Sequence, residues 1–259
     1  MPANIDHKCF IQPKDSKIKL WRYMDFTKFV SLISKEELFF CRADLFKDPF
    51  EGSYSKANSI LSPLVYAKSS IDSGIPIERL IQSQEIGNNV LAKFRRQWYY
   101  ISCWHKNEFE SAAMWDLYSN GEGSIAIETN YELLQNNLPD NSYMGLVKYI
   151  DYQTEWLPEG NTFFPFMHKR KSFEHESEVR IVISDEESIP RDKKGYDLNS
   201  TNPRSGVFVP IKLGDVINTI HISPLTPSWM VDAIRDVSNK YGITSTIKQS
   251  NLYNDPFTK

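Results

Sequence analysis

The sequence Ser177-Glu178-Val179-Arg180-Ile181-Val182-Ile183-Ser184 carries the clearest strand pattern in the chain. Side chains on a strand alternate between its two faces. One face would be apolar, with Val179, Ile181 and Ile183. The other face would collect the charged residues Glu174, Glu176, Glu178 and Arg180. The pattern therefore predicts a half-buried strand that presents charge on its second face.

Further segments combine apolar residues at strand spacing with turn residues at their ends. They lie at residues 18–22, 38–41, 98–104, 124–127, 146–150, 207–211, 216–222 and 243–247. Arg22 would lie on the first of these strands and Ser102 on the third.

Apolar residues at helical spacing predict helices between these strands. The predicted helices cover residues 26–33, 76–97, 108–119 and 227–241. Residues expected at their ends are Asp25, the capping-box pair Asn107 and Glu110, Gly121 and Gly242. Gly87 would weaken the second helix, and residues 54–75 carry no clear pattern.

These elements predict a single α+β domain over residues 1–259, with a mixed, mainly antiparallel β core and helices packed around it. The strand–helix–strand order near the carboxyl end predicts one βαβ-like unit. Residues 185–205 are polar and contain glycine and proline, so we expect a long surface loop there. One hypothesis is that this loop covers the functional site as a lid.

The composition is that of a folded protein, with 41% hydrophobic and 24% charged residues in a chain of 259. No apolar run approaches the roughly 20 residues that span a bilayer, so no membrane contact is expected. A net charge of −3 gives the chain no overall attraction for nucleic acid. Cys9, Cys41 and Cys103 form no CxxC pair, which argues against a zinc site and against a disulfide framework. These features favour a reducing cytoplasm.

Two segments carry carboxylates that are candidates for chemistry. They are Glu174-His175-Glu176-Ser177-Glu178 and the turn Asp48-Pro49-Phe50-Glu51-Gly52. Carboxylates on one strand face repel one another, which raises their pKa values unless cations such as Arg180 or the basic residues 169–171 compensate. The same residues would also suit a ladder of ion pairs on an exposed strand. Structural and functional interpretations of both segments stay open.

Several of these segments resemble a bacterial family known only as domain of unknown function twenty-nine seventy-one. The residues that carry the resemblance are Leu20-Trp21-Arg22-Tyr23, Leu38-Phe39-Phe40, Asp48-Pro49-Phe50-Glu51, Ser102-Cys103-Trp104, Met114-Trp115 with Tyr118, Gly123, Lys171, Phe173, Glu176, Glu178, Arg180 and Ile222-Ser223-Pro224. The resemblance covers nearly the whole chain, but it implies relatives and not an activity.

The chain also resembles, more weakly, the ADP-ribosyltransferases that use an arginine, a serine and a glutamate on successive strands. Arg22, Ser102 and the pair Glu176 and Glu178 occur in that order. The resemblance implies an NAD-consuming enzyme, either an ADP-ribosyltransferase or an NAD glycohydrolase, acting as a bacterial toxin or phage-defence effector by analogy. It also implies an ADP-ribosyltransferase-like fold and a protein or nucleic-acid acceptor.

The resemblance implies a role for each of these residues. Glu178 would orient the ribose and stabilise its oxocarbenium-like transition state, and Glu176 would position or deprotonate the acceptor. Arg22 would bind the pyrophosphate and Tyr118 would stack on nicotinamide. The expected substrate-binding set is Arg22, Asp48, Glu51, Ser102, Tyr118 and Arg180. NAD would be a substrate, and no metal is expected.

Two other functions remain open at this point. In a metal-dependent nuclease or phosphohydrolase, a Mg²⁺ ion would bind the carboxylates of Asp48, Glu51, Glu176 and Glu178. In a non-catalytic binding module, Arg22, Glu178 and Arg180 would form a structural ion network.

Overall fold

A nine-stranded sheet forms the centre of the chain, which a computed structural model describes at residues 7–118, 123–193 and 195–257. Its strands are β1 Lys19–Met24, β2 Glu37–Arg42, β3 Tyr99–Lys106, β4 Ile125–Asn130, β5 Ser142–Leu146, β8 Glu178–Ser184, β11 Gly206–Pro210, β12 Thr219–Ile222 and β13 Thr246–Gln249. All neighbours pair antiparallel except β12 and β13, which are parallel and joined by α8 Ser228–Lys240. The predicted α+β class, mainly antiparallel core and late βαβ unit are confirmed.

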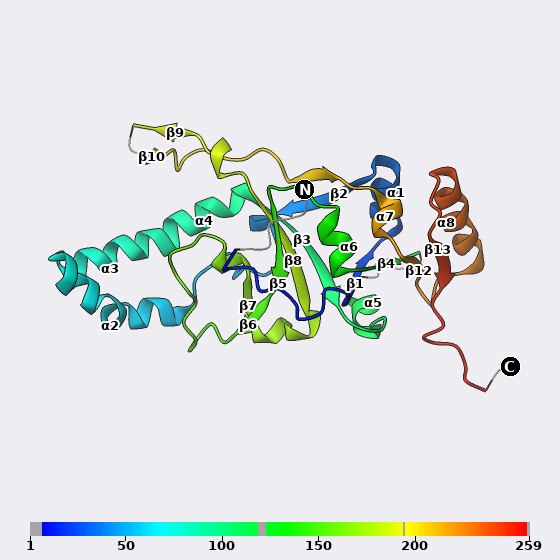
Figure 1. Cartoon of the computed structure of the whole chain (residues 1–259), viewed down its shortest axis with the longest axis horizontal. Helices are drawn as coiled ribbons and strands as arrows, with labels where there is room; N and C mark the ends of the chain where they lie inside the picture. The colour runs from blue at the N-terminus through cyan, green and yellow to red at the C-terminus, as the bar shows by residue number, and fades with distance from the viewer. Residues whose placement is uncertain (1–6, 119–122, 194, 258–259) are drawn as a thin grey trace.

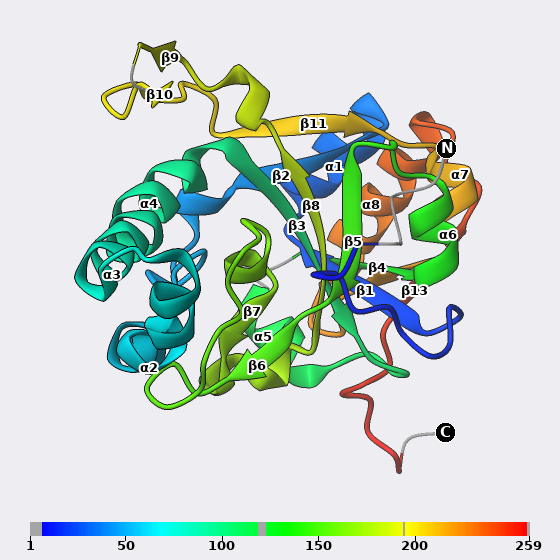
Figure 2. The same ribbon diagram turned by 60° about the vertical axis from the view of Figure 1, so that its left-hand side comes forward.

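The sheet forks at β3. Strand β8 pairs with β3 from Tyr99 to His105, and β5 pairs with the far edge of β8 (Figure 2). Strand β2 pairs with β3 near Ile101, whereas β1 pairs with it only near His105. Strand β8 occupies one edge of β3 from Tyr99 to His105. Strands β1 and β2 therefore share the other edge of β3, and a gap separates them between Ile101 and His105.

Helices cover one face of the sheet. They are α1 Phe26–Lys35, α6 Tyr131–Asn136, α7 Leu213–Val216 and α8 (Figure 1). The largest apolar cluster lies beneath them and includes Leu20, Phe40, Trp104, Ile181 and Ile220. As predicted, the Asp25 side chain caps α1 by accepting a hydrogen bond of 2.8 Å from the backbone nitrogen of Lys28.

Strand β8 is buried on both faces, so the prediction of a half-buried strand is wrong. Its face with Ile181 joins the main apolar cluster. Its other face, with Val182 and Arg180, lies under the loop that holds Phe166 and under the amino-terminal residue Phe10. Period-two alternation does not reveal what covers the second face.

The predicted strand face also includes residues before Glu178 that do not lie on the strand. Residues Lys171–Glu176 form a 3-10 helix, and Ser177 has a left-handed backbone with φ of 41°. The alternation therefore begins at Glu178, and Glu174 and Glu176 do not lie on the strand.

A helical arm extends from the sheet at the end opposite α8 (Figure 1). It consists of α2 Lys56–Ser73, α3 Ile77–Glu85, a π-helical segment Ile86–Leu91 and α4 Ala92–Arg95. The helix predicted at 76–97 is present, and Gly87 lies in its π-helical segment. Helix α2 went unpredicted because Pro63 lies inside it and because its polar and apolar residues do not follow a core-facing pattern.

Helix α5 Ala112–Tyr118 begins four residues later than predicted. Ser111 caps it by accepting a hydrogen bond from the nitrogen of Met114, whereas the carboxylate of Glu110 accepts one from the Trp115 indole. The predicted capping box of Asn107 and Glu110 is therefore wrong. The predicted end of this helix, Ser119 and Gly121, lies outside the described residues.

The strand predicted at 146–150 is divided between the end of β5 and β6 Lys148–Ile150, which pairs in parallel with β7 His168–Arg170. The predicted loop 185–205 contains a small hairpin, β9 Arg191–Asp192 and β10 Gly195–Tyr196. Its residues Ile189 and Tyr196 pack against Phe94 and Trp98 at the base of the arm. Among the described residues, no helix has the length and apolar character needed to cross a membrane.

Candidate functional site

Five buried charged residues form what we call the ionic cluster: Glu51, Lys169, Glu176, Glu178 and Arg180. Arg180 is fully buried at its centre. Its Nε donates to Glu178 at 2.5 Å, and its two terminal nitrogens each donate to Glu51 at 2.7 Å. This paired geometry is the strongest form of guanidinium–carboxylate contact.

Lys169 forms the second half of the cluster. Its ammonium nitrogen lies 2.5 Å from Glu176 and 2.7 Å from Glu178, with Glu51 at 3.7 Å. The ring of Phe173 lies 4.8 Å away and covers the ammonium group. Both oxygens of Glu178 are thus used, one by Lys169 and one by Arg180.

Four separate segments supply these side chains. Glu178 and Arg180 are two residues apart on β8 and so share a face. Lys169 comes from β7, and Glu51 from the turn after β2. The left-handed backbone at Ser177 ends the 3-10 helix, and it lies between the two glutamates that contact Lys169.

The predicted turn residue Asp48 lies beside the cluster and not in it. Its carboxylate accepts a hydrogen bond from the nitrogen of Phe50 and forms an ion pair of 2.8 Å with Arg170. The guanidinium of Arg170 also stacks over the ring of Phe50 at 4.4 Å. Asp48 therefore shapes the turn that carries Glu51.

The charges of the ionic cluster explain the raised pKa of Glu176. Three carboxylates face two cations, so the cluster is neutral when one carboxyl group holds a proton. Burial and the adjacent Glu178 carboxylate raise the pKa of Glu176 to about 7, against the opposing effect of Lys169. Burial also acts to raise the pKa of Glu178, but Arg180 and Lys169 outweigh it and hold that pKa far below its usual range. Glu176 is the group that exchanges a proton near neutrality.

This assignment predicts how stability depends on pH. The pKa of Glu176 is higher in the fold than in the unfolded chain, so the folded state binds more protons between the two values and its stability falls as pH rises. Relative to Glu176→Gln, we expect the wild-type free energy of unfolding to fall by about 2 kcal/mol between about pH 5 and about pH 8. Urea titrations at both values measure it, and parallel curves for the two proteins would contradict the assignment.

Arg22 and Ser102 contact each other but lie on the opposite face of the sheet. Arg22 donates to the Ser102 hydroxyl at 2.6 Å and to the Phe39 carbonyl at 2.9 Å, in the fork between β1 and β2. Ser102 pairs in register with Ile181, which faces the helix-covered core, whereas Glu178 faces the other way. The sheet therefore separates the expected arginine and serine from the expected glutamates.

Burial without a carboxylate partner lowers the pKa of Arg22 to about 10. Its two hydrogen bonds and the Trp104 ring, 5.6 Å away, hold the guanidinium in the fork. These contacts give Arg22 a structural part in joining β1, β2 and β3.

Two further side chains lie near the ionic cluster. Tyr118, at the end of α5, is 43% exposed, and burial together with the charges of Glu176 and Glu178 raises its pKa. His105 is buried, and its Nδ1 lies 2.6 Å from the carbonyl oxygen of Glu176. Since a carbonyl only accepts, Nδ1 carries the hydrogen and donates it.

The expectation that a residue of the basic run 169–171 compensates the carboxylates is confirmed for Lys169, whereas no role was predicted for His105. Lys169 belongs to a run of basic residues that is typical of a solvated surface, and His105 directly follows an apolar run. In the sequence, Lys169 is marked only by its position a few residues before Glu176 and Glu178, and His105 only by its position directly after the strand that ends at Trp104.

The four carboxylates proposed for Mg²⁺ are engaged by cations. Asp48 pairs with Arg170, Glu51 with Arg180, Glu176 with Lys169 and Glu178 with both Arg180 and Lys169. Within the described ranges, no three His, Cys, Asp or Glu side chains are grouped to hold a metal ion.

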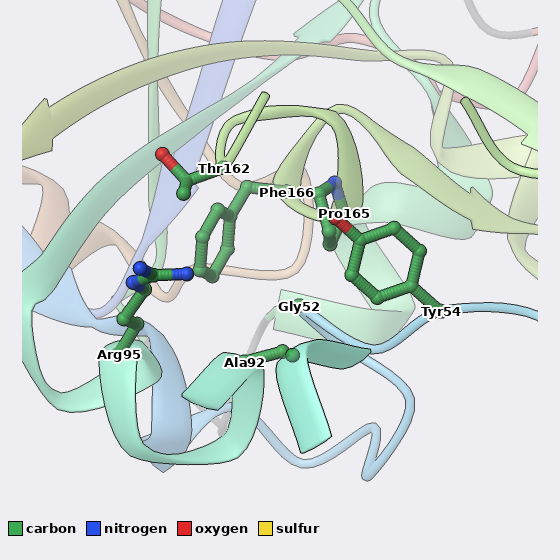
Figure 3. A pocket seen from close by; sticks show the side chains of 8 residues that line it. Gly52, Tyr54, Ala92, Arg95, Thr162, Pro165 and Phe166 are labelled. Atoms are coloured by element: carbon green, nitrogen blue, oxygen red, sulfur yellow. The ribbon is translucent and has the colours of Figure 1, made fainter. Parts of the chain in front are cut away.

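Two hollows lie away from the cluster. One, of about 20 Å³, lies at the base of the arm between Gly52, Arg95 and Phe166 (Figure 3). It has room for about one water molecule. The other is a groove of about 310 Å³ along β11 that includes Tyr100 and Arg204. Neither is lined by a residue of the ionic cluster.

The loop 185–205 is not placed as a lid over Glu176 and Glu178. It leaves β8 after Ser184, whereas Glu178 lies at the opposite end of that strand, about 20 Å away along the backbone. The described residues of the loop contact Trp98 and Gln97 instead.

No known protein family, no curated protein and no solved structure matches this sequence or its fold.

Proposed function

We propose that this chain cleaves the glycosidic bond between nicotinamide and ribose in NAD, with Glu176 as the group that moves the proton. The observation that carries the proposal is the pair of neighbouring carboxyl groups whose pKa values are driven apart. Such pairs are typical of acid–base sites, and glycosidic bonds are commonly broken by two carboxyl groups.

In this proposal Glu176 acts as a general base. It takes a proton from the acceptor, which is water or a hydroxyl group, while the acceptor attacks the anomeric carbon and nicotinamide leaves with the bonding electrons. A pKa of about 7 lets Glu176 accept that proton near neutral pH. Only the ionised form does so, so we expect activity to rise with pH through this value.

Glu178 is a positioning residue in this proposal. Its two oxygens bind Lys169 and Arg180, so neither is free for the ribose. Its charge keeps the Glu176 pKa high, and its hold on Lys169 fixes the ammonium group that contacts Glu176. Tyr118, half exposed beside this pair, supplies an aromatic face for nicotinamide.

The pyrophosphate contact expected of Arg22 has no part in the proposal. Arg22 and Ser102 are separated from Glu176 by the sheet. The NAD hypothesis rests here on the carboxyl pair alone, and the likeness to ADP-ribosyltransferases is not used.

The test is nicotinamide release from NAD by the purified chain, in a chelator, with and without bacterial lysate as a source of acceptor. We expect release above the no-enzyme rate, and no loss of it in chelator. Mg²⁺-dependent cleavage of a phosphodiester or pyrophosphate bond, without release of nicotinamide, would favour the nuclease or phosphohydrolase hypothesis. No release in any condition would contradict the proposal.

One observation favours a second candidate, a non-catalytic binding module. Arg180 binds both oxygens of Glu51 and one oxygen of Glu178, and Lys169 binds the other, as expected of an ion network that only holds segments together. A silent NAD assay combined with a large loss of stability in Glu178→Gln would favour this candidate.

A further inference from the structure

Arg170, beside the ionic cluster, has hydrogen-bond donors that no described residue uses. Its Nε donates to one oxygen of Asp48 at 3.2 Å, and its Nη2 donates to the other at 2.8 Å. A guanidinium group carries five N–H donors, so three remain, one on Nη2 and two on Nη1. Within the part of the chain that the structure describes, no other group accepts from them. The edge between Nη1 and Nη2 is therefore free to bind a further anion.

Two aromatic rings fix the orientation of this guanidinium. The ring centroids of Phe50 and Phe173 lie 4.4 Å and 5.2 Å from its central carbon. Asp48 is buried and holds one edge of the group, whereas the Arg170 side chain is 33% exposed. The group is thus held in one orientation with part of it open to solvent. Such preorganisation reduces the entropy that is lost when a ligand binds.

The Phe173 ring also links Arg170 to the group proposed to move the proton. Its centroid lies 4.8 Å from the Lys169 ammonium nitrogen, and that nitrogen contacts the Glu176 carboxylate at 2.5 Å. One aromatic ring therefore contacts both cations. An anion bound to Arg170 would be separated from the Lys169–Glu176 pair by this single ring.

We propose that the free edge of Arg170 binds the phosphate group attached to the nicotinamide ribose of the substrate. This inference rests on the proposed function, and it names nicotinamide nucleotides as the substrate class. In NAD, one methylene group and one ester oxygen separate this phosphate from the ribose ring whose bond is cleaved. Two parallel N–H···O bonds from a guanidinium match the geometry of two phosphate oxygens. Lys171, the next cation along the chain, pairs instead with Glu155 at 2.7 Å.

The test compares the Michaelis constants of NAD, nicotinamide mononucleotide and nicotinamide riboside, which has no phosphate. Arg170→Lys keeps the positive charge beside Asp48 but loses the free edge. We expect this variant to raise KM for NAD and for the mononucleotide about tenfold with little change in kcat, as for a lost hydrogen bond to a charged group. Its KM for the riboside should equal that of the wild type.

Lys171→Met is the matched control. Lys171 is adjacent to Arg170, is 58% exposed and is paired with Glu155, so the KM for NAD should not change in this variant. An Arg170→Lys variant with the wild-type KM for NAD would overturn the inference. An equal rise in KM for the riboside would overturn it too, because Arg170 would then act only on the shape of the site.

A second measurement separates this inference from the proposed function. Isothermal titration calorimetry with inorganic pyrophosphate requires no turnover. We expect the wild type to bind pyrophosphate and Arg170→Lys to bind it about tenfold more weakly. If that result is obtained but no substrate releases nicotinamide, the proposed function fails and the phosphate site is supported. A chain that neither binds pyrophosphate nor releases nicotinamide would contradict both.

Discussion

Arg180→Met is expected to lower the free energy of unfolding by about 3–5 kcal/mol. Arg180 is fully buried and is the main cation for Glu51 and Glu178. Without it, the three buried carboxyl groups Glu51, Glu176 and Glu178 share only Lys169, and burying an unpaired charge costs several kcal/mol. Methionine fills similar volume, so the loss reflects charge more than a cavity. Urea denaturation near neutral pH measures the change.

Arg204→Met is the matched control. Its side chain is 50% exposed and pairs with a single carboxylate, Asp185, which is not buried, so we expect a loss of about 1 kcal/mol or less. If Arg180→Met yields too little folded protein, Arg180→Lys provides a milder variant, because it keeps the positive charge and loses only the paired hydrogen bonds to Glu51. An Arg180→Met variant as stable as Arg204→Met would contradict the importance of the cluster.

Glu176→Gln is expected to reduce nicotinamide release by about 10²–10⁴-fold while the chain stays folded. Glutamine matches glutamate in shape but cannot accept the proton of the acceptor. In the wild type, the rate should rise with pH around a midpoint of about 7. The assay is the initial rate of release across pH, with circular dichroism as the check on folding.

Two variants sharpen this measurement. Glu174→Gln changes an exposed carboxylate in the same 3-10 helix and should leave the rate unchanged. Glu178→Gln removes the charge that raises the Glu176 pKa, so the midpoint should move to lower pH in whatever folded protein remains. A fully active Glu176→Gln variant would remove Glu176 from the proposed chemistry.

Local patterns were sufficient for much of the fold. The strands around Arg22, Phe40 and Ser102 lie where their apolar spacing predicts them, and so does the helix capped by Asp25. The turn at Asp48 was also predicted, because Pro49 fixes φ and Gly52 tolerates a left-handed backbone, which it adopts with φ of 70°. These features depend on residues a few positions apart, so they can be recognised without tertiary information. Helix α2 escaped recognition because Pro63, a residue typical of helix ends and turns, lies inside it.

The carboxylates of the candidate site could be named from the sequence, but their partners and surroundings could not. Glu176 and Glu178 are two residues apart in the sequence, which suggests that they act together. In the structure Lys169 contacts both carboxylates and keeps them close. Their burial depends on Glu51 and Arg180, which are brought together across a separation of 129 residues.

Local spacing predicts most of the strands and the helices that begin after Asp25 and Pro227, but not helix α2. It does not predict that Arg22 and Ser102 face one side of the sheet while Glu178 and Arg180 face the other, which is a property of the folded chain. The order of residues along a chain does not specify the register and the fork of a sheet. Register alone decides which face each side chain occupies, and a shift of one residue would reverse it.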